Sequence, residues 1–97
     1  MKRFFVYILA TRKDGTLYVG ITNNLQRRVF EHKTHIIRGF TARYNVDRLV
    51  WFEMHDSPEA AIQKEKQIKR WRRTWKKELI EATNPEWRDL YEMLKPE

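Results

Sequence analysis

The chain has 97 residues, which are enough for one folded domain and too few for two. Because 41% of them are hydrophobic and 13% aromatic, the composition is not that of a disordered chain. Its net charge of +7 favours a polyanionic partner, most simply nucleic acid, and no stretch has the roughly 20 apolar residues that span a bilayer. Because the chain has no cysteine, a disulfide framework and a thiolate metal site are excluded, and the cytoplasm is the default location.

The beginning of the chain predicts two strands joined by a turn. Phe4–Leu9 follows two basic residues but is short, rich in aromatic and β-branched residues, and not followed by a small-residue cleavage site, so it is interpreted as a strand and not as a signal peptide. The turn is Thr11–Thr16, and Leu17–Ile21 forms the second strand. Alternation puts Tyr18 and Gly20 on one face, and a glycine inside a strand usually marks a bulge or a close backbone approach.

A helix is predicted over Leu25–Lys33, with Thr22 or Asn23 as its N-cap. Helical spacing places Arg28 and His32 four residues apart, beside the buried edge of this helix. Taken alone, His32 fits a hydrogen-bonded histidine of the core.

The segment His35–Asn45 has no clean periodicity and mixes basic with aromatic residues. Such a mixture suits phosphate contact and base stacking, which makes Arg38, Thr41 and Arg43 candidate nucleic-acid contacts. An ordinary loop with Phe40 or Tyr44 packed into the core explains the composition equally well.

A third strand is predicted over Arg48–Met54, and one long helix over Asp56–Glu81, with Asp56 or Ser57 as the N-cap and Pro58 in the first turn. Helical spacing collects an apolar stripe on one face of this helix: Ala61, Ile68, Trp71, Trp75 and Leu79. The opposite face is strongly basic and suits a DNA backbone; we select from it Lys69, Arg72, Arg73 and Lys76 as nucleic-acid contacts.

Glu65 is the exception, because it is a carboxylate that falls inside the apolar stripe. A carboxylate on a packing face must be paired, neutralised or bound to a metal. From this helix alone, a structural ion pair with a neighbouring Lys or Arg is sufficient to explain Glu65.

A last helix is predicted over Glu86–Leu94, with Asn84 as its N-cap. The order of elements is then β-β-α-β-α-α. Short, hairpin-linked strands followed by helices indicate an α+β domain with a small antiparallel sheet covered by helices.

Together these residues form a pattern. FVY with Tyr7 lies in the first strand, YVG with Tyr18 in the second, and Arg28, His32 and the helical Glu65 follow. The arrangement resembles the GIY-YIG nuclease superfamily, and within it the small single-domain, UvrC-like (UPF0213-type) branch. The clearest stretch is LYVGITNNLQRRVFEHK, supported by GFTARY, KEKQIKRW and NPEW, so the resemblance covers nearly the whole chain.

The resemblance implies a three-stranded antiparallel sheet flanked by helices and a metal-dependent DNA endonuclease, with roles in DNA repair or recombination and selectivity for DNA structure. It implies six catalytic residues. One of the two tyrosines Tyr7 and Tyr18, by preference Tyr7, activates or positions water, and Arg28 stabilises the phosphate charge. His32 assists proton transfer or orients a tyrosine, Glu65 is the metal ligand, and Asn84 supports the site. The first motif departs from the family, because Phe5 and Val6 replace its glycine and isoleucine.

The implied cofactor is one Mg²⁺ or Mn²⁺ ion. Because Mg²⁺ keeps several waters and relies on substrate phosphates, a single carboxylate such as Glu65 would hold it weakly without DNA. The ion can lower the pKa of water, and arginine offers a fixed fork of donors to a phosphate.

Two other functions remain open at this point. The first is a nucleic-acid-binding module of the same fold that cuts little or not at all. The second is a protein-interaction domain that uses the tryptophan-rich helices. A protein partner that supplies DNA specificity is compatible with the endonuclease and with the nucleic-acid-binding module.

Overall fold

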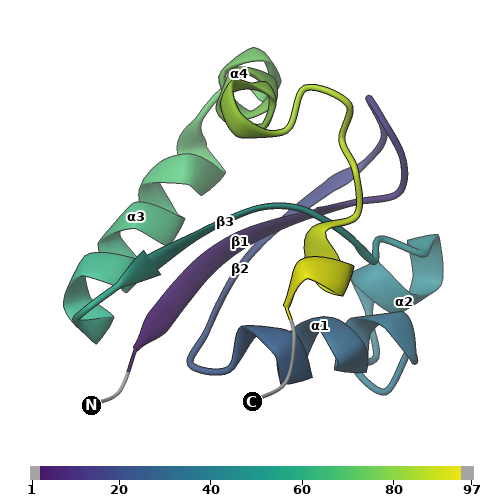
Figure 1. Cartoon of the computed structure of the whole chain (residues 1–97), viewed down its shortest axis with the longest axis horizontal. Helices are drawn as coiled ribbons and strands as arrows, with labels where there is room; N and C mark the ends of the chain where they lie inside the picture. Colours follow the sequence, from purple (N-terminus) through teal and green to yellow (C-terminus); the bar gives the residue numbers. More distant parts are fainter. Residues whose placement is uncertain (1–2, 95–97) are drawn as a thin grey trace.

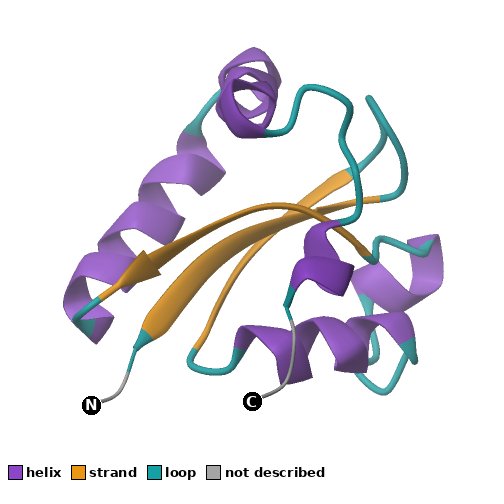
Figure 2. Ribbon diagram, in the orientation of Figure 1, coloured by secondary structure: helices purple, strands orange, loops and turns teal. Residues whose placement is uncertain are grey.

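The structure is a computed structural model that describes residues 3–94. In chain order the elements are β1 (Phe4–Ala10), β2 (Leu17–Thr22), α1 (Leu25–Lys33), α2 (Phe40–Tyr44), β3 (Arg48–His55), α3 (Pro58–Arg70), α4 (Arg73–Thr83) and a short 3-10 helix, η1 (Leu90–Met93). β1 lies between β2 and β3 and is antiparallel to both, and helices lie on both faces of the sheet (Figure 1 and Figure 2). The predicted α+β class, with a three-stranded antiparallel sheet flanked by helices, is confirmed.

The central strand supplies side chains to both faces of the sheet. On the first face, which we call the α3–α4 face, Val6 and Ile8 are fully buried among apolar residues of the two helices and the chain after them: Ala61, Ile68, Ile80 and Trp87. On the second, the α1 face, Tyr7 and Leu9 pack with apolar residues of α1, of β3 and of the segment just before β3: Leu25, Val29, Val46 and Leu49. Figure 1 shows α3 and α4 on one side of the sheet and α1, α2 and η1 on the other.

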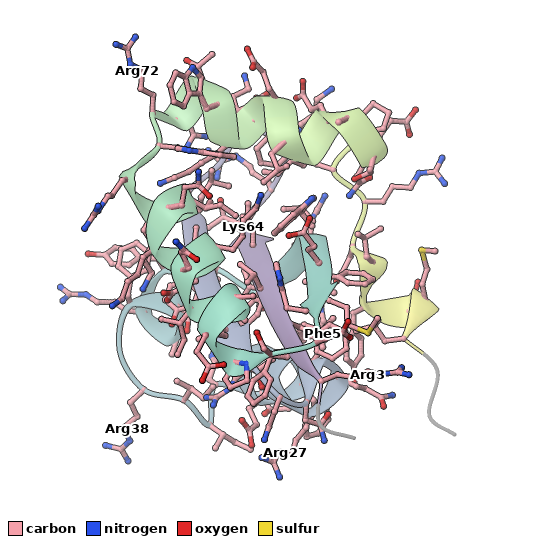
Figure 3. The ribbon with its side chains drawn as sticks, turned by 90° about the vertical axis from the view of Figure 1, so that its left-hand side faces the viewer. Arg3, Phe5, Arg27, Arg38, Lys64 and Arg72 are labelled. Carbon is pink, nitrogen blue, oxygen red and sulfur yellow. The ribbon has the colours of Figure 1, made fainter. Side chains whose placement is uncertain are left out.

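The prediction of a single helix over Asp56–Glu81 is wrong. Ser57 caps α3 by accepting a hydrogen bond from the backbone N–H of Ala60 at 3.2 Å, but Trp71 and Arg72 have extended backbones, and α4 begins anew at Arg73. A straight helix of the predicted length would measure roughly 39 Å, whereas the longest dimension of the molecule is 35 Å. The break lets α4 lie across the end of α3 (Figure 3) and puts Ile80 in the core.

The break also changes the predicted apolar stripe. Ala61 and Ile68 are buried as expected, and Trp71 and Leu79 are partly buried against the core. Trp75, however, is 51% exposed and touches Trp71 edge-on, with their ring centroids 6.1 Å apart. The stripe therefore ends as a packing face at the break.

The prediction of a last helix over Glu86–Leu94 is also wrong, since η1 is the helical segment there. Trp87 has a left-handed backbone with φ of 57°, which is incompatible with a continuing helix. Burial compensates for this conformation, because the Trp87 ring is fully buried and its Nε1–H donates to Glu81 Oε2 at 2.7 Å. Asn84 accordingly lies at the C-terminus of α4 and does not cap a following helix.

Three smaller corrections concern the N-cap of α1, the segment after α1 and the ends of the strands. The N-cap of α1 is Asn24, whose Oδ1 accepts from the Arg27 backbone N–H at 3.1 Å, while Thr22 bonds the Asn24 backbone N–H. The segment His35–Asn45 contains the short α2, which the sequence periodicity did not predict. Each of the three strands is one residue longer than predicted.

In residues 3–94, no helix is long and apolar enough to cross a membrane.

Candidate active site

Two tyrosines from paired strands lie together on the α1 face. Tyr7 is buried and Tyr18 half-buried, with their ring centroids 6.4 Å apart. Gly20 lies opposite Tyr7 in the strand register, and a Cβ added there would be 2.5 Å from both Cζ and Oη of Tyr7. Residue 20 must therefore lack a side chain for the Tyr7 hydroxyl to occupy its position. The close approach predicted for Gly20 exists, but the approaching group is an aromatic ring and not a backbone.

Helix α1 places His32 against both tyrosines. The Tyr7 Oη lies 3.1 Å from His32 Nε2, and the rings of Tyr18 and His32 are 5.5 Å apart. On its other side, His32 Nδ1 lies 2.9 Å from Thr41 Oγ1 of α2. These contacts form a buried chain of three hydrogen-bonding groups from Tyr7 through His32 to Thr41.

Burial fixes the protonation states of this chain. The pKa of Tyr7 lies above its ordinary range, first because burial disfavours the phenolate and then because of Tyr18, with Glu65 and Glu31 adding to the effect and Arg28 opposing it. Burial, and after it the positive charge of Arg28, lowers the pKa of His32 below its usual 6.5. At neutral pH, Tyr7 is therefore protonated and His32 neutral.

These states leave two tautomers of His32, and we assign one of them from the partner of the Tyr7 hydroxyl. Among the described residues, the Tyr7 hydroxyl has His32 as its side-chain partner, so Tyr7 donates to Nε2. The proton of the neutral His32 ring then lies on Nδ1 and is donated to the Thr41 hydroxyl. His32 is thus held in the tautomer that can accept a proton from Tyr7.

Arg28 and Glu65 bring opposite charges to this cluster. Arg28 lies one turn before His32 on α1, its side chain is 40% exposed, and its Nη1 is 3.9 Å from Glu31. Glu65 comes from α3, its side chain is 13% exposed, and its carboxylate lies 2.7 Å from the Nζ of Lys69. Both charges act on Tyr7, which places a cation and a carboxylate within electrostatic range of one tyrosine.

The structure gives Asn84 different contacts from those of the other five predicted catalytic residues. Its Nδ2 donates to the backbone carbonyls of Val50 at 3.1 Å and of Arg88 at 2.9 Å, and its Oδ1 accepts from the Arg88 N–H at 3.0 Å. These bonds tie the end of α4 to β3. Within residues 3–94 no hydrogen bond joins Asn84 to the tyrosine–histidine cluster, so its observed contacts are structural and its implied support of the site stays a prediction.

Thr41 has a role that sequence reasoning missed. It was selected as a nucleic-acid contact, but it is buried, and its hydroxyl is occupied by His32. A partner nine residues away, across a turn and in an unpredicted helix, leaves no periodic signal in the sequence. The position of Thr41 suits it to hold His32 and not to touch DNA.

The other predicted nucleic-acid contacts do not form one patch. Arg38 and Arg72 project into solvent from distant parts of the molecule (Figure 3). Several others are engaged within the protein: Lys69 pairs with Glu65, Arg73 donates to the Gly15 carbonyl, and Arg43 lies over the Tyr44 ring at 5.5 Å. Lys76 is half-buried on α4.

Phe5 shows how the departure in the first motif is accommodated. It continues the regular pairing of β1 with both neighbouring strands, and its ring packs edge-on against Phe52, with centroids 6.5 Å apart. The phenylalanine therefore adds packing on the α1 face without disturbing the strand that carries Tyr7.

Comparison with known proteins shows what the whole chain is similar to. The family model of the GIY-YIG catalytic domain matches residues 3–78. A UPF0213 protein of Natronomonas pharaonis is 40% identical over 76 residues, covering 78% of this chain and 88% of that protein, and one of Syntrophus aciditrophicus is 39% identical over 90 residues, covering 89% and 98%. The solution NMR structure of a UPF0213 protein from Bacillus halodurans is similar with a TM-score of 0.57, 26% identity, and coverage of 97% of this chain and 99% of that one.

Proposed function

The chain belongs to the GIY-YIG catalytic domain family, and we propose that it is a metal-dependent DNA endonuclease that hydrolyses phosphodiester bonds, selects DNA by its structure and serves repair or recombination. The family's nuclease character makes DNA the expected substrate. The observation that carries the proposal is the buried chain from Tyr7 through His32 to Thr41, set within range of the opposite charges of Arg28 and Glu65. A domain stabilised for structure alone would not need a neutral histidine aligned with a tyrosine hydroxyl.

The Tyr7–His32 pair provides a path for the proton of the attacking water. As Tyr7 Oη takes a proton from water, its own proton passes along the existing hydrogen bond to His32 Nε2. The His32 ring then becomes an imidazolium, whose Nδ1–H remains bonded to Thr41. This transfer avoids a free phenolate, which the raised pKa of Tyr7 makes costly.

Arg28 supplies the positive charge for the phosphate. Its half-exposed guanidinium offers several donors in a fixed plane, and its contact with Glu31 at 3.9 Å is loose enough to be exchanged for a phosphate. The transition state of hydrolysis carries more negative charge on the phosphate oxygens than the ground state, so a cation in this position favours it.

Glu65 fits a single, weakly held divalent cation. Across residues 3–94, no group of three or more His, Asp or Glu side chains is gathered to hold a metal, which argues against a preformed site with several protein ligands. One carboxylate paired with a lysine whose side chain is 52% exposed suits Mg²⁺ or Mn²⁺, which would take its other ligands from water and substrate phosphate. When bound, such an ion polarises the phosphate and lowers the pKa of coordinated water.

The decisive experiment compares cleavage by the purified protein and by Glu65→Gln. Supercoiled plasmid and labelled branched DNA are incubated with Mg²⁺, Mn²⁺ or EDTA. We expect metal-dependent cutting that falls at least about 100-fold in both Glu65→Gln and Arg28→Ala, because Glu65→Gln weakens the protein ligand of the metal and Arg28→Ala removes a cation that stabilises the phosphate charge. Binding of DNA in EDTA should change much less in Glu65→Gln.

Glu59→Gln is the matched control, because Glu59 is an exposed carboxylate in the first turn of the same helix. It should cut like the unmodified protein. If Glu65→Gln cuts as fast as Glu59→Gln, Glu65 is not the metal ligand. If the unmodified protein binds every DNA and cuts none, the chain is a binding module of this fold and not an endonuclease.

A further inference from the structure

A second surface with features of a ligand site lies on α2, next to the catalytic cluster. We call it the α2 platform and define it by five residues around the short helix: Ile36, Arg38, Phe40, Arg43 and Tyr44. Ile36, Phe40 and Tyr44 are 65%, 48% and 50% exposed, so three large apolar side chains face solvent within one short segment. Sequence reasoning left open whether Phe40 or Tyr44 enters the core, and the structure shows that neither does.

The two rings of the platform form a pair that leaves room for a third. Phe40 and Tyr44 are four residues apart on one side of α2, with ring centroids 5.0 Å apart and a tilt of 51° between the ring planes. Because about half of each side chain is exposed, a flat apolar group can contact them without displacing protein atoms. Aromatic surfaces of this kind stack nucleobases irrespective of sequence, since every base has a π face.

The charge around the rings favours a polyanion. The segment His35–Asn45 contains two arginines and no acidic residue. The Arg43 guanidinium lies 5.5 Å from the Tyr44 ring centroid, and Arg38 projects freely from the loop before α2 (Figure 3). One cation over a ring and a second two residues before Phe40 in the chain suit the alternation of phosphate and base along a single strand.

The position of the platform relates it to the chemistry. Thr41 lies between Phe40 and Tyr44 in sequence, yet it turns inward and bonds His32 at 2.9 Å. The outer side of α2 therefore carries the rings while its inner side holds the histidine of the active site. The platform and the tyrosine–histidine cluster are therefore joined through the same short helix.

We propose that the α2 platform stacks an unpaired base of the DNA strand that is cut, so that the substrate class is DNA with a single-stranded segment at a branch, flap or gap. Bases in a continuous duplex stack on each other and do not offer their faces to Phe40 and Tyr44. This inference rests on the proposed endonuclease for the position of the cut phosphate, but the binding it describes does not require cleavage.

The test measures binding in EDTA, where no cutting can interfere, to two DNAs of equal length: a full duplex and a duplex with a short single-stranded flap. The flap carries the fluorescent base 2-aminopurine, whose emission changes when it stacks. We expect the double variant Phe40→Ala/Tyr44→Ala to bind the flap DNA about tenfold more weakly and to lose the emission change, because base stacking on aromatic side chains is worth this much. Its affinity for the duplex should change by less than about twofold.

Two controls separate stacking from general damage. Trp75→Ala removes another large ring, 51% exposed on α4 and outside the platform, and should leave the preference for flap DNA unchanged. Phe40→Tyr/Tyr44→Phe keeps both rings and should bind like the unmodified protein. Thermal melting checks that every variant remains folded.

The outcomes distinguish the platform from the nuclease itself. If the unmodified protein prefers flap DNA and the double alanine variant does not, the platform is supported whether or not any DNA is cut. If the protein binds duplex and flap DNA equally, or if Trp75→Ala loses the preference as strongly, the platform inference is overturned while the endonuclease proposal stands on its own assay. If it binds neither DNA, the exposed rings serve a protein partner and the inference also fails.

Discussion

The two faces of the sheet are built on the same central strand but in different ways. The α3–α4 face is an apolar core in which Val6, Ile8, Ile68 and Ile80 are fully buried among each other. The α1 face buries Tyr7, His32 and Thr41 as well, and these three polar side chains are joined by two hydrogen bonds. One face contributes to stability through apolar area, and the other places polar groups in geometry that stability alone does not require.

This difference supports the α1 face as the place of the proposed chemistry. Buried polar groups cost free energy unless every one is hydrogen-bonded, so an aligned set next to a core is informative about function. Adjacent residues of β1 belong to different faces: Tyr7 bonds His32 on the α1 face, and Ile8 lies in the core of the α3–α4 face. Neighbouring substitutions in one strand can therefore separate activity from stability.

The largest effect is expected for Tyr7→Phe. Removal of one hydroxyl abolishes the proton path to His32 while keeping the ring, so the rate of DNA cutting should fall by about 100- to 10,000-fold. The free energy of unfolding should fall by about 1 kcal/mol, because the Nε2 of His32 loses its partner. Plasmid cleavage and denaturant unfolding measure the two quantities, and full activity in this variant would remove Tyr7 from the mechanism.

The opposite balance is expected for the next residue, Ile8→Ala. Deleting most of a fully buried side chain should lower the free energy of unfolding by about 2–5 kcal/mol. Below the unfolding transition, the rate of cutting should stay within about threefold of normal, since Ile8 faces away from the tyrosines. A fall in cutting rate as large as that of Tyr7→Phe, in protein shown to be folded by circular dichroism, would show that the two faces are not independent.

A smaller effect should come from Thr41→Val, which removes the acceptor of the His32 Nδ1–H. We expect cutting to fall about tenfold, and Thr41→Ser to restore it, because a hydroxyl is what holds the tautomer. In the proposed mechanism the neutral form of His32 is the active one, so activity should fall as the pH decreases through the pKa of His32. Burial and Arg28 lower this pKa, and the weaker effects of Glu31 and Asp47 raise it. Loss of Thr41 makes the imidazolium still less stable, so the acid limb of the pH profile should move to lower pH.

An unchanged pH profile in Thr41→Val would mean that Thr41 contributes packing alone. A shift of the acid limb to higher pH would contradict the assigned direction of the hydrogen bond. The matched control is Thr34→Val, because Thr34 is an exposed threonine at the end of α1 whose hydroxyl bonds the backbone carbonyl of Phe30.

Local sequence was sufficient for the elements that local physics controls. The three strands follow from runs of β-branched and aromatic residues, and α1 follows from the spacing of Leu25 and Val29 with polar residues between them. The same spacing placed Arg28 and His32 on one side of α1, and helical periodicity placed Glu65 near the buried side of α3. The strand register was not needed for any of these inferences.

Local sequence failed where long-range packing overrides helical propensity. Neither residue at the break, Trp71 or Arg72, is a glycine or a proline. The helix breaks there because α4 has to cross the end of α3 to bury Ile80. Trp87 likewise leaves the helical region so that its ring can fill the core and reach Glu81.

By itself, the sequence determined the fold class and the family, and it selected the residues proposed for the chemistry, because motif spacing along strands and helices is set by local geometry. The tertiary structure alone decided that His32 is neutral, that Thr41 holds it, that Gly20 makes room for the Tyr7 hydroxyl, and that Phe40 and Tyr44 face solvent. These depend on burial and on contacts between segments distant in the chain, and neither burial nor such a contact is a property of a local stretch of sequence.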